Sequence, residues 1–209
     1  MRLGIFGGSF DPVHYGHLIL AETCREQCRL DQVWFVPAAV PPHKQREPPT
    51  AAKSRVEMLE LAVGGHSAFA ISGQEIERGG VSYTVDTLTA IQQQVPGAEL
   101  FLLMGADSLC DLPSWRNPRR ICELAIPLVV RRHGTPEVDF ELLAELVDAA
   151  RLAEIRRHQV EAPVIELSST DLRQRVQDGR SIRFRIPRAV EKYIESNGLY
   201  RQSGRTGPG

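Results

Sequence analysis

The chain has 209 residues, of which 42% are hydrophobic and 24% charged, and its net charge is −1 at pH 7. These proportions exclude wholesale disorder and fibrous repeats, and the small net charge supplies no global field for nucleic acid. The longest apolar runs, 33–40 and 124–130, are far shorter than the roughly 20 residues of a membrane span, and residues 1–4 enter a strand pattern without a signal core. We therefore expect a cytoplasmic protein with no nucleic-acid and no membrane partner.

Short apolar segments alternate with helical segments along the chain. Strands are predicted at 2–6, 33–36, 69–72, 100–104, 126–130 and 164–167. Helices are predicted at 16–29, 51–63, 84–95, 137–157, 169–177 and 187–196. This alternation favours an α/β fold, a Rossmann-like doubly wound parallel sheet with a small C-terminal helical portion. We expect one domain over residues 1–201 and a disordered tail over 202–209.

The cysteines show no Cys-x-x-Cys spacing. Cys24 and Cys28 lie four residues apart on a predicted helix, whereas Cys110 and Cys122 lie far from them. Buried thiols in a reducing compartment fit this pattern better than a metal site or a disulfide. We therefore predict no protein-bound structural metal.

The most informative segment is 4–17, where an apolar strand ends in Gly7-Gly8 and a helix begins a few residues later. Glycines let backbone N–H groups approach a ligand closely, and a helix N-terminus adds free donors and a positive dipole end. Together they make an anion site suited to phosphate. His14 and His17 flank Gly16, and both imidazoles can donate to one polyphosphate. The alternative is a plain strand–helix turn with capping residues.

A second motif, Ser168-Ser169-Thr170 followed by Arg173, lies where a predicted strand gives way to a helix. One hydroxyl there would only cap the helix. Three hydroxyls and an arginine one turn later predict a second phosphate cradle. Neither a P-loop nor a Gly-x-Gly-x-x-Gly fingerprint is present, which disfavours P-loop ATPase chemistry and ordinary dinucleotide-dependent oxidation.

These two motifs resemble the nucleotidyltransferase superfamily marked by (His/Thr)-x-Gly-His, and most closely the bacterial nicotinate-nucleotide adenylyltransferases. The resemblance runs from residue 3 to about 201, in family order, and includes further matches at 40–44, 82–88, 105–109, Trp115, 131–132 and 193–200. It implies a single nucleotidyltransferase domain. It also implies transfer of AMP from ATP to nicotinate mononucleotide, by direct in-line attack, giving deamido-NAD and pyrophosphate.

The resemblance also implies the roles of individual residues. The catalytic residues are His14, His17 and Arg173. The ATP-binding residues are Gly7, Gly8, Ser9, Phe10, Gly16, Gly105, Asp107, Ser168, Ser169 and Thr170. The residues that bind the mononucleotide are Lys44, Thr84 and Trp115. Mg²⁺ is expected to arrive with ATP, held mainly by phosphate and water, with no dedicated carboxylate cage.

The residues themselves support parts of this assignment and leave alternative roles open. The helix start at Thr84 favours a pyridine carboxylate over a neutral amide, and Trp115 can stack on a cationic ring. Asp107 could instead cap a helix, Lys44 could be a surface lysine, and Trp115 could pack in the core. Other acceptors of the superfamily, such as phosphopantetheine or a CTP-dependent pair, remain open, as does a non-catalytic nucleotide-binding protein. The oligomeric state is not encoded in any motif.

Overall fold

The structure, a computed structural model, describes residues 1–41, 49–132 and 138–201. Six parallel strands form a single sheet in the order β3-β2-β1-β4-β5-β6. The strands are β1 (Arg2–Gly8), β2 (Gln32–Pro37), β3 (Phe69–Ile71), β4 (Glu99–Gly105), β5 (Ala125–Arg132) and β6 (Gln159–Ala162). The predicted Rossmann-like parallel sheet is thus confirmed.

Helices connect the strands and close the chain. The α-helices are α1 (Tyr15–Gln27), α2 (Ala52–Val63), α3 (Gln74–Arg78), α4 (Thr84–Gln94), α5 (Ala106–Asp111), α6 (Pro118–Leu124), α7 (Ala149–Arg157), α8 (Ser169–Gln177) and α9 (Arg188–Ser196). Two short 3-10 turns are η2 (Leu112–Ser114) and η3 (Glu141–Leu143). In the described parts of the chain, no helix is both long and apolar enough to cross a membrane.

The core lies along the central strands, which are buried on both faces. Leu3 and Ile5 of β1 are at most 2% exposed, and Phe101 of β4 and Phe35 of β2 are fully buried. A parallel sheet covered on both sides needs such continuous apolar strands, because neither face meets water. This requirement explains why the strands were recognisable as unbroken apolar runs.

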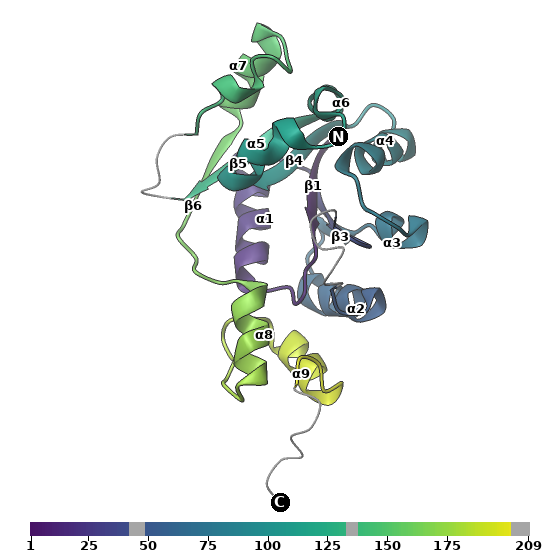
Figure 1. Ribbon diagram of the computed structural model, residues 1–209, viewed down its shortest axis with the longest axis vertical. Helices are drawn as coiled ribbons and strands as arrows, with labels where there is room; N and C mark the ends of the chain where they lie inside the picture. Colours follow the sequence, from purple (N-terminus) through teal and green to yellow (C-terminus); the bar gives the residue numbers. More distant parts are fainter. Residues whose placement is uncertain (42–48, 133–137, 202–209) are drawn as a thin grey trace, which may run out of the picture.

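The order of the strands reverses at β1, which pairs with β2 on one side and with β4 on the other. In doubly wound sheets, ligands bind in the crevice outside the carboxyl ends of the strands at this switch point. Here those ends are Gly8 and Gly105. Helices α8 and α9 lie beyond the carboxyl end of β1, at the opposite end of the molecule from α7 (Figure 1). They form the expected C-terminal helical portion.

Two predicted elements are wrong. The single helix predicted over 137–157 is the short turn η3 followed by α7, because Asp148 has an extended backbone and its side chain accepts the Arg151 N–H, which starts a new helix there. The strand predicted over 164–167 is absent. The last strand is β6, whose alternating burial suits an edge strand, and Pro163 follows it directly.

Other predictions differ less from the structure. The short helices α3, α5 and α6 were not predicted, because segments of five to seven residues show too little periodicity. The predicted tail 202–209 lies outside the described residues, and so does Lys44. Every other predicted strand and helix overlaps an observed one, and the predicted helix 169–177 matches α8 at both ends.

Gly4 of β1 offers a test of core packing. A Cβ there would lie 2.8 Å from Leu30 Cδ1 and 3.1 Å from Leu103 Cδ1. We expect Gly4→Ala to lower the free energy of unfolding by about 1–3 kcal/mol through overpacking. In Gly73→Ala the new Cβ meets only the flexible Glu77 side chain, so we expect a change within about 0.5 kcal/mol. Urea unfolding of both variants checks this, and equal losses would contradict it.

Candidate active site

The turn after β1, residues 9–12, has its carbonyl oxygens occupied by groups from elsewhere in the chain. Three of them accept side-chain hydrogen bonds: Ser9 O from Arg55 Nη1 (2.9 Å), Asp11 O from Arg173 Nη1 (2.7 Å) and Pro12 O from Ser169 Oγ (2.9 Å). The Asp11–Pro12 peptide bond is cis. Three of the four carbonyl oxygens of this turn are therefore satisfied from distant segments.

The donors of the same turn are not satisfied. Among hydrogen bonds between described residues, the backbone N–H groups of Ser9, Phe10 and Asp11 have no acceptor. A run of free N–H groups beside a helix N-terminus is an arrangement that binds phosphate. Phe10 has a positive φ of 49° although its ring is buried, so the surrounding packing enforces this backbone conformation.

His14 and His17 lie directly beyond the turn, at the start of α1. Their rings stack with centroids 3.7 Å apart, and the His14 N–H donates to His17 Nδ1 at 3.2 Å. Because Nδ1 accepts, the proton of the neutral His17 ring is on Nε2, which is then free to donate to a ligand. A Cβ on Gly16 would come within 2.9 Å of His14 Nδ1, so the absence of a side chain at Gly16 makes room for this ring.

Burial sets the charge of both histidines. Burial lowers the pKa of His14 from 6.5 to about 4, against the opposing effect of a backbone hydrogen bond. The pKa of His17 is well below 6.5, mainly through burial and secondly through the nearby His14. Phe6 and Phe10 contribute to this burial, with ring centroids 6.0 and 5.1 Å from that of His17. Both imidazoles are therefore neutral at pH 7 in the ligand-free protein.

The second predicted cradle meets the first at the start of α8. Ser168 caps the helix by accepting the Asp171 N–H at 3.1 Å, while Ser169 and Arg173 reach the turn as described above. Thr170 is exposed and lies 3.4 Å from Arg173 Nη2. The structure thus brings together two motifs more than 150 residues apart, but it uses Ser169 and Arg173 to hold the turn and Ser168 as a cap.

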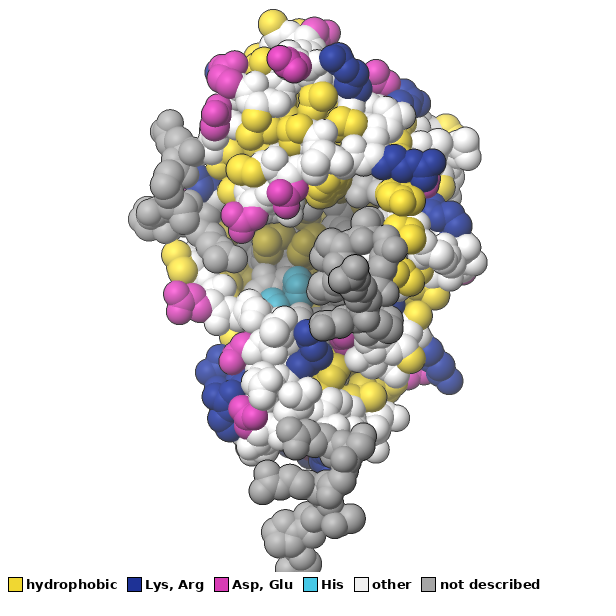
Figure 2. Space-filling view, in the orientation of Figure 1, with side chains coloured by type: hydrophobic (Ala, Val, Ile, Leu, Met, Phe, Trp, Pro, Cys, Tyr) yellow, Lys and Arg dark blue, Asp and Glu magenta, His cyan; other side chains and the backbone are white. Residues whose placement is uncertain are grey.

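Figure 2 shows this face of the molecule, with a hollow that has histidine side chains at its floor and Lys or Arg side chains below it.

Two residues predicted to bind ATP, Gly105 and Asp107, lie at the carboxyl end of β4. Asp107 is exposed in the first turn of α5, and the space beside Gly105 is open. The N-cap of α5 is Gly105, so the alternative role of Asp107 as a helix cap is wrong.

Of the residues predicted to bind the mononucleotide, Thr84 and Trp115 lie at the start of α4 and directly after η2. Thr84 is the first residue of α4, and Trp115 is partly buried and packs against the core. Arg116, which sequence reasoning gave no role, lies 3.5 Å from Asp86 and 4.6 Å from the centre of the Tyr83 ring. This arginine joins the two segments and places its charge beside the helix start.

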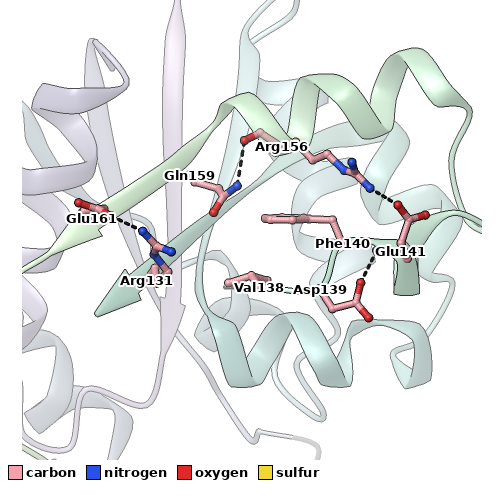
Figure 3. Close-up of a pocket in the computed structure, with 8 residues that line it drawn as sticks. All are labelled: Arg131, Val138, Asp139, Phe140, Glu141, Arg156, Gln159 and Glu161. Carbon is pink, nitrogen blue, oxygen red and sulfur yellow. Dashed lines mark hydrogen bonds and ion pairs between the residues drawn. The ribbon is translucent and has the colours of Figure 1, made fainter. Parts of the chain in front are cut away.

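A separate cavity of about 570 Å³ lies near the ends of β5 and β6 (Figure 3). Four of its charged residues pair among themselves, Arg131 with Glu161 and Arg156 with Glu141, and Asp139 accepts the Glu141 N–H. Neither histidine lines it. Paired charges offer little to an ionic ligand, so we place the site at the turn and not in this cavity.

In the described ranges, no three His, Cys, Asp or Glu side chains are grouped so that they could hold a metal ion. The carboxylate of Asp11, which belongs to the turn, accepts hydrogen bonds from Tyr200 Oη and the Thr50 N–H. A metal that accompanies a phosphate ligand would thus be held by that ligand and by water.

Comparison with known proteins identifies the class. The chain matches the family model described as "Cytidylyltransferase-like" over residues 5–175, which places it among the cytidylyltransferase-like nucleotidyltransferases. Two similar proteins are each named "Probable nicotinate-nucleotide adenylyltransferase". The one from Thermomicrobium roseum is 48% identical, covering 96% of this chain and 92% of its own length. The one from Thermus thermophilus is 43% identical, covering 96% and 100%. The chain belongs to the nicotinate-nucleotide adenylyltransferase family within that class.

Solved structures agree on the fold. The Plasmodium falciparum nicotinic acid mononucleotide adenylyltransferase complexed with NaAD superposes with a TM-score of 0.72. The match covers 95% of this chain and 97% of that one, at 18% identity. The same protein complexed with APC gives a TM-score of 0.70. At such low identity the likeness concerns the fold, and it confirms the predicted nucleotidyltransferase fold.

The buried histidines predict a dependence of stability on pH. The unfolded chain binds a proton on each imidazole near pH 6.5, whereas folded His14 does so only near pH 4. The unfolded state therefore holds more protons in this window, and the free energy of unfolding falls as pH drops from 6.5 towards 4. The His14→Asn substitution should reduce the slope of the free energy of unfolding against pH by up to about 1.4 kcal/mol per pH unit. Urea unfolding at pH 7 and pH 5 measures it, and parallel slopes for wild type and variant would contradict the assignment.

Proposed function

We propose that this chain joins nicotinate mononucleotide to the AMP part of ATP, releasing pyrophosphate. One observation carries the mechanism: the turn after β1 offers backbone N–H groups that have no acceptor among the described residues, next to two neutral histidines at the switch point of the sheet. Such a site positions phosphates and neutralises their charge without a covalent intermediate.

The reaction is a single displacement at phosphorus. A phosphate oxygen of the mononucleotide attacks the α-phosphorus of ATP, and the bond to the bridging oxygen of the β-phosphate breaks, so pyrophosphate leaves with the electron pair. His17 donates from Nε2 to an oxygen of the α-phosphate, and His14 supports it by stacking. The turn N–H groups hold the phosphate oxygens shared by ATP and the product. Mg²⁺ would neutralise the charge of the triphosphate.

The remaining predicted residues are assigned in the same proposal. Asp107 accepts hydrogen bonds from the ribose of ATP, and Thr84 at the start of α4 faces the pyridine carboxylate. Trp115 stacks on the pyridinium ring. Arg173 keeps donors beyond the one on Asp11 O, and these serve the departing pyrophosphate together with Thr170. The proposed contact of Lys44 with the mononucleotide phosphate concerns a residue outside the described parts of the chain.

The reaction is tested by incubating the protein with ATP, Mg²⁺ and one mononucleotide while following pyrophosphate release. We expect rapid release with nicotinate mononucleotide and slow release with nicotinamide mononucleotide, because a helix start favours the carboxylate. Equal pyrophosphate release with both mononucleotides would support the reaction but contradict the expected preference for the carboxylate. No release with either, but release with phosphopantetheine, would assign the chain to a sibling reaction.

The role of His17 predicts a large kinetic effect. Removing a donor that stabilises charge in the transition state costs about 10²–10³-fold in kcat, so we expect at least that loss for His17→Ala. His66→Ala is the matched control, because that imidazole stacks on Phe69 away from the turn. Steady-state kinetics of both variants measure this effect. A loss of kcat below tenfold for His17→Ala would show that His17 does not stabilise the transition state.

The role of Trp115 predicts a selective effect on one substrate. Stacking on a cationic ring is worth about 0.5–2 kcal/mol, so Trp115→Ala should raise KM for nicotinate mononucleotide by roughly threefold to thirtyfold. The KM for ATP should change far less. Trp34→Phe removes the other indole, which bonds to Gln32, and serves as control. Equal changes in both KM values for Trp115→Ala would indicate a purely structural role.

A further inference from the structure

The Asp11 side chain joins three segments of the chain beneath the phosphate-binding turn. It is 5% exposed. Its Oδ1 accepts a hydrogen bond from Tyr200 Oη at 2.5 Å, and its Oδ2 accepts one from the Thr50 N–H at 3.0 Å. Burial, together with the negative charge of Asp11, raises the pKa of Tyr200 far above 10, so the phenol keeps its proton and donates. A buried carboxylate with both oxygens bonded has one preferred position.

Arg55 supports the same turn from the next segment. Its side chain is 1% exposed, its Nε donates to Thr50 O at 2.8 Å, and its Nη1 donates to Ser9 O at 2.9 Å. Thr50 is thus held through its carbonyl by Arg55 and through its N–H by Asp11. The turn, Thr50 and Tyr200 form one connected network around the buried Asp11 and Arg55 side chains, called here the Asp11 network.

The Asp11 network acts on the part of the turn that faces ligand. The N–H groups of Phe10 and Asp11, which have no acceptor among the described residues, lie between the Arg55 contact on Ser9 O and the Asp11 side chain along the chain. Phe10 has a positive φ. This backbone conformation costs about 1–3 kcal/mol and persists only where the surrounding contacts hold it. Loss of a contact on Asp11 therefore frees the turn at the point where its donors must be aimed.

We propose that Tyr200 is a positioning residue for adenylyl transfer: its hydroxyl fixes Asp11 and so holds the N–H groups of residues 9–11 in the geometry that the transferring phosphate requires. This proposal rests on the proposed function for the identity of the acceptor. It does not place Tyr200 in contact with substrate. It assigns a kinetic role to a residue that follows α9 and stands 189 positions after Asp11.

The chain offers a matched control for Tyr200. Tyr193 Oη donates to the carboxylate of Glu57, so Tyr193→Phe also removes a tyrosine–carboxylate hydrogen bond from the C-terminal region. Glu57 belongs to α2 and has no contact with the turn among the hydrogen bonds of described residues. Any general loosening of the C-terminal helices should therefore appear in both variants, whereas an effect on the turn should appear in Tyr200→Phe alone.

The test compares Tyr200→Phe, Tyr193→Phe and wild type in kcat, in KM for both substrates and in melting temperature. We expect Tyr200→Phe to lower kcat roughly tenfold or more, with each KM within about threefold, because small displacements of aimed donors cost rate more than binding. We expect Tyr193→Phe to keep kcat within about twofold of wild type. Full kcat in Tyr200→Phe, or losses in both variants that follow their melting temperatures, would overturn the proposal.

A double-mutant cycle supplies the second readout. If Tyr200 acts through Asp11, then Tyr200→Phe should change kcat little in an Asp11→Ala background, although each single change is costly. Additive effects would overturn the proposal even if both single variants are slow. Should wild type prefer another acceptor, the proposed function fails, but the same ratios measured with that acceptor still decide the role of Tyr200. Should no acceptor react, both the proposed function and the role of Tyr200 in adenylyl transfer would be overturned.

Discussion

The hydrogen-bonding needs of one buried backbone turn organise this protein. A buried peptide carbonyl without a partner is costly, and the turn after β1 has three that no regular secondary structure could satisfy. Arg55, Ser169 and Arg173 satisfy them from outside. The N–H groups of residues 9–11 have no acceptor among the described residues and remain for a ligand. The anion site is thus a by-product of how the acceptors are satisfied, and the segments around residues 55 and 170 are part of the site for that reason.

Burial also determines the charge of His14 and His17. Stacking against each other and against phenylalanine rings removes them from water, so they stay neutral and donate single hydrogen bonds instead of carrying full charge. A neutral donor does not bind a stray anion as strongly as an imidazolium does. It can still gain strength as negative charge develops during phosphoryl transfer, because few waters compete in a desolvated site.

Sequence reasoning located the two motifs and the sheet, since both depend on local patterns: apolar strand runs, paired glycines and hydroxyls at a helix start. It could not assign a role to Arg55, Tyr200 or Arg116, because each contacts a segment that is distant in the sequence. It assigned Ser169 and Arg173 to a phosphate cradle, whereas the structure shows their contacts with the turn, a pairing across about 160 residues that no spacing reveals. The errors at 137–157 and 164–167 arose where a polar cap and an edge strand carry weak periodicity.

The hydrogen bond between Tyr200 and Asp11 also bears on biosynthesis. Chains are made from the N-terminus at about 5–20 residues per second, so the turn leaves the ribosome many seconds before its last partner. During that interval strands β1 and β2 can already pair, but the Asp11 carboxylate lacks its hydrogen bond from Tyr200. The network that holds the turn is therefore completed only after almost all of the described chain has been made.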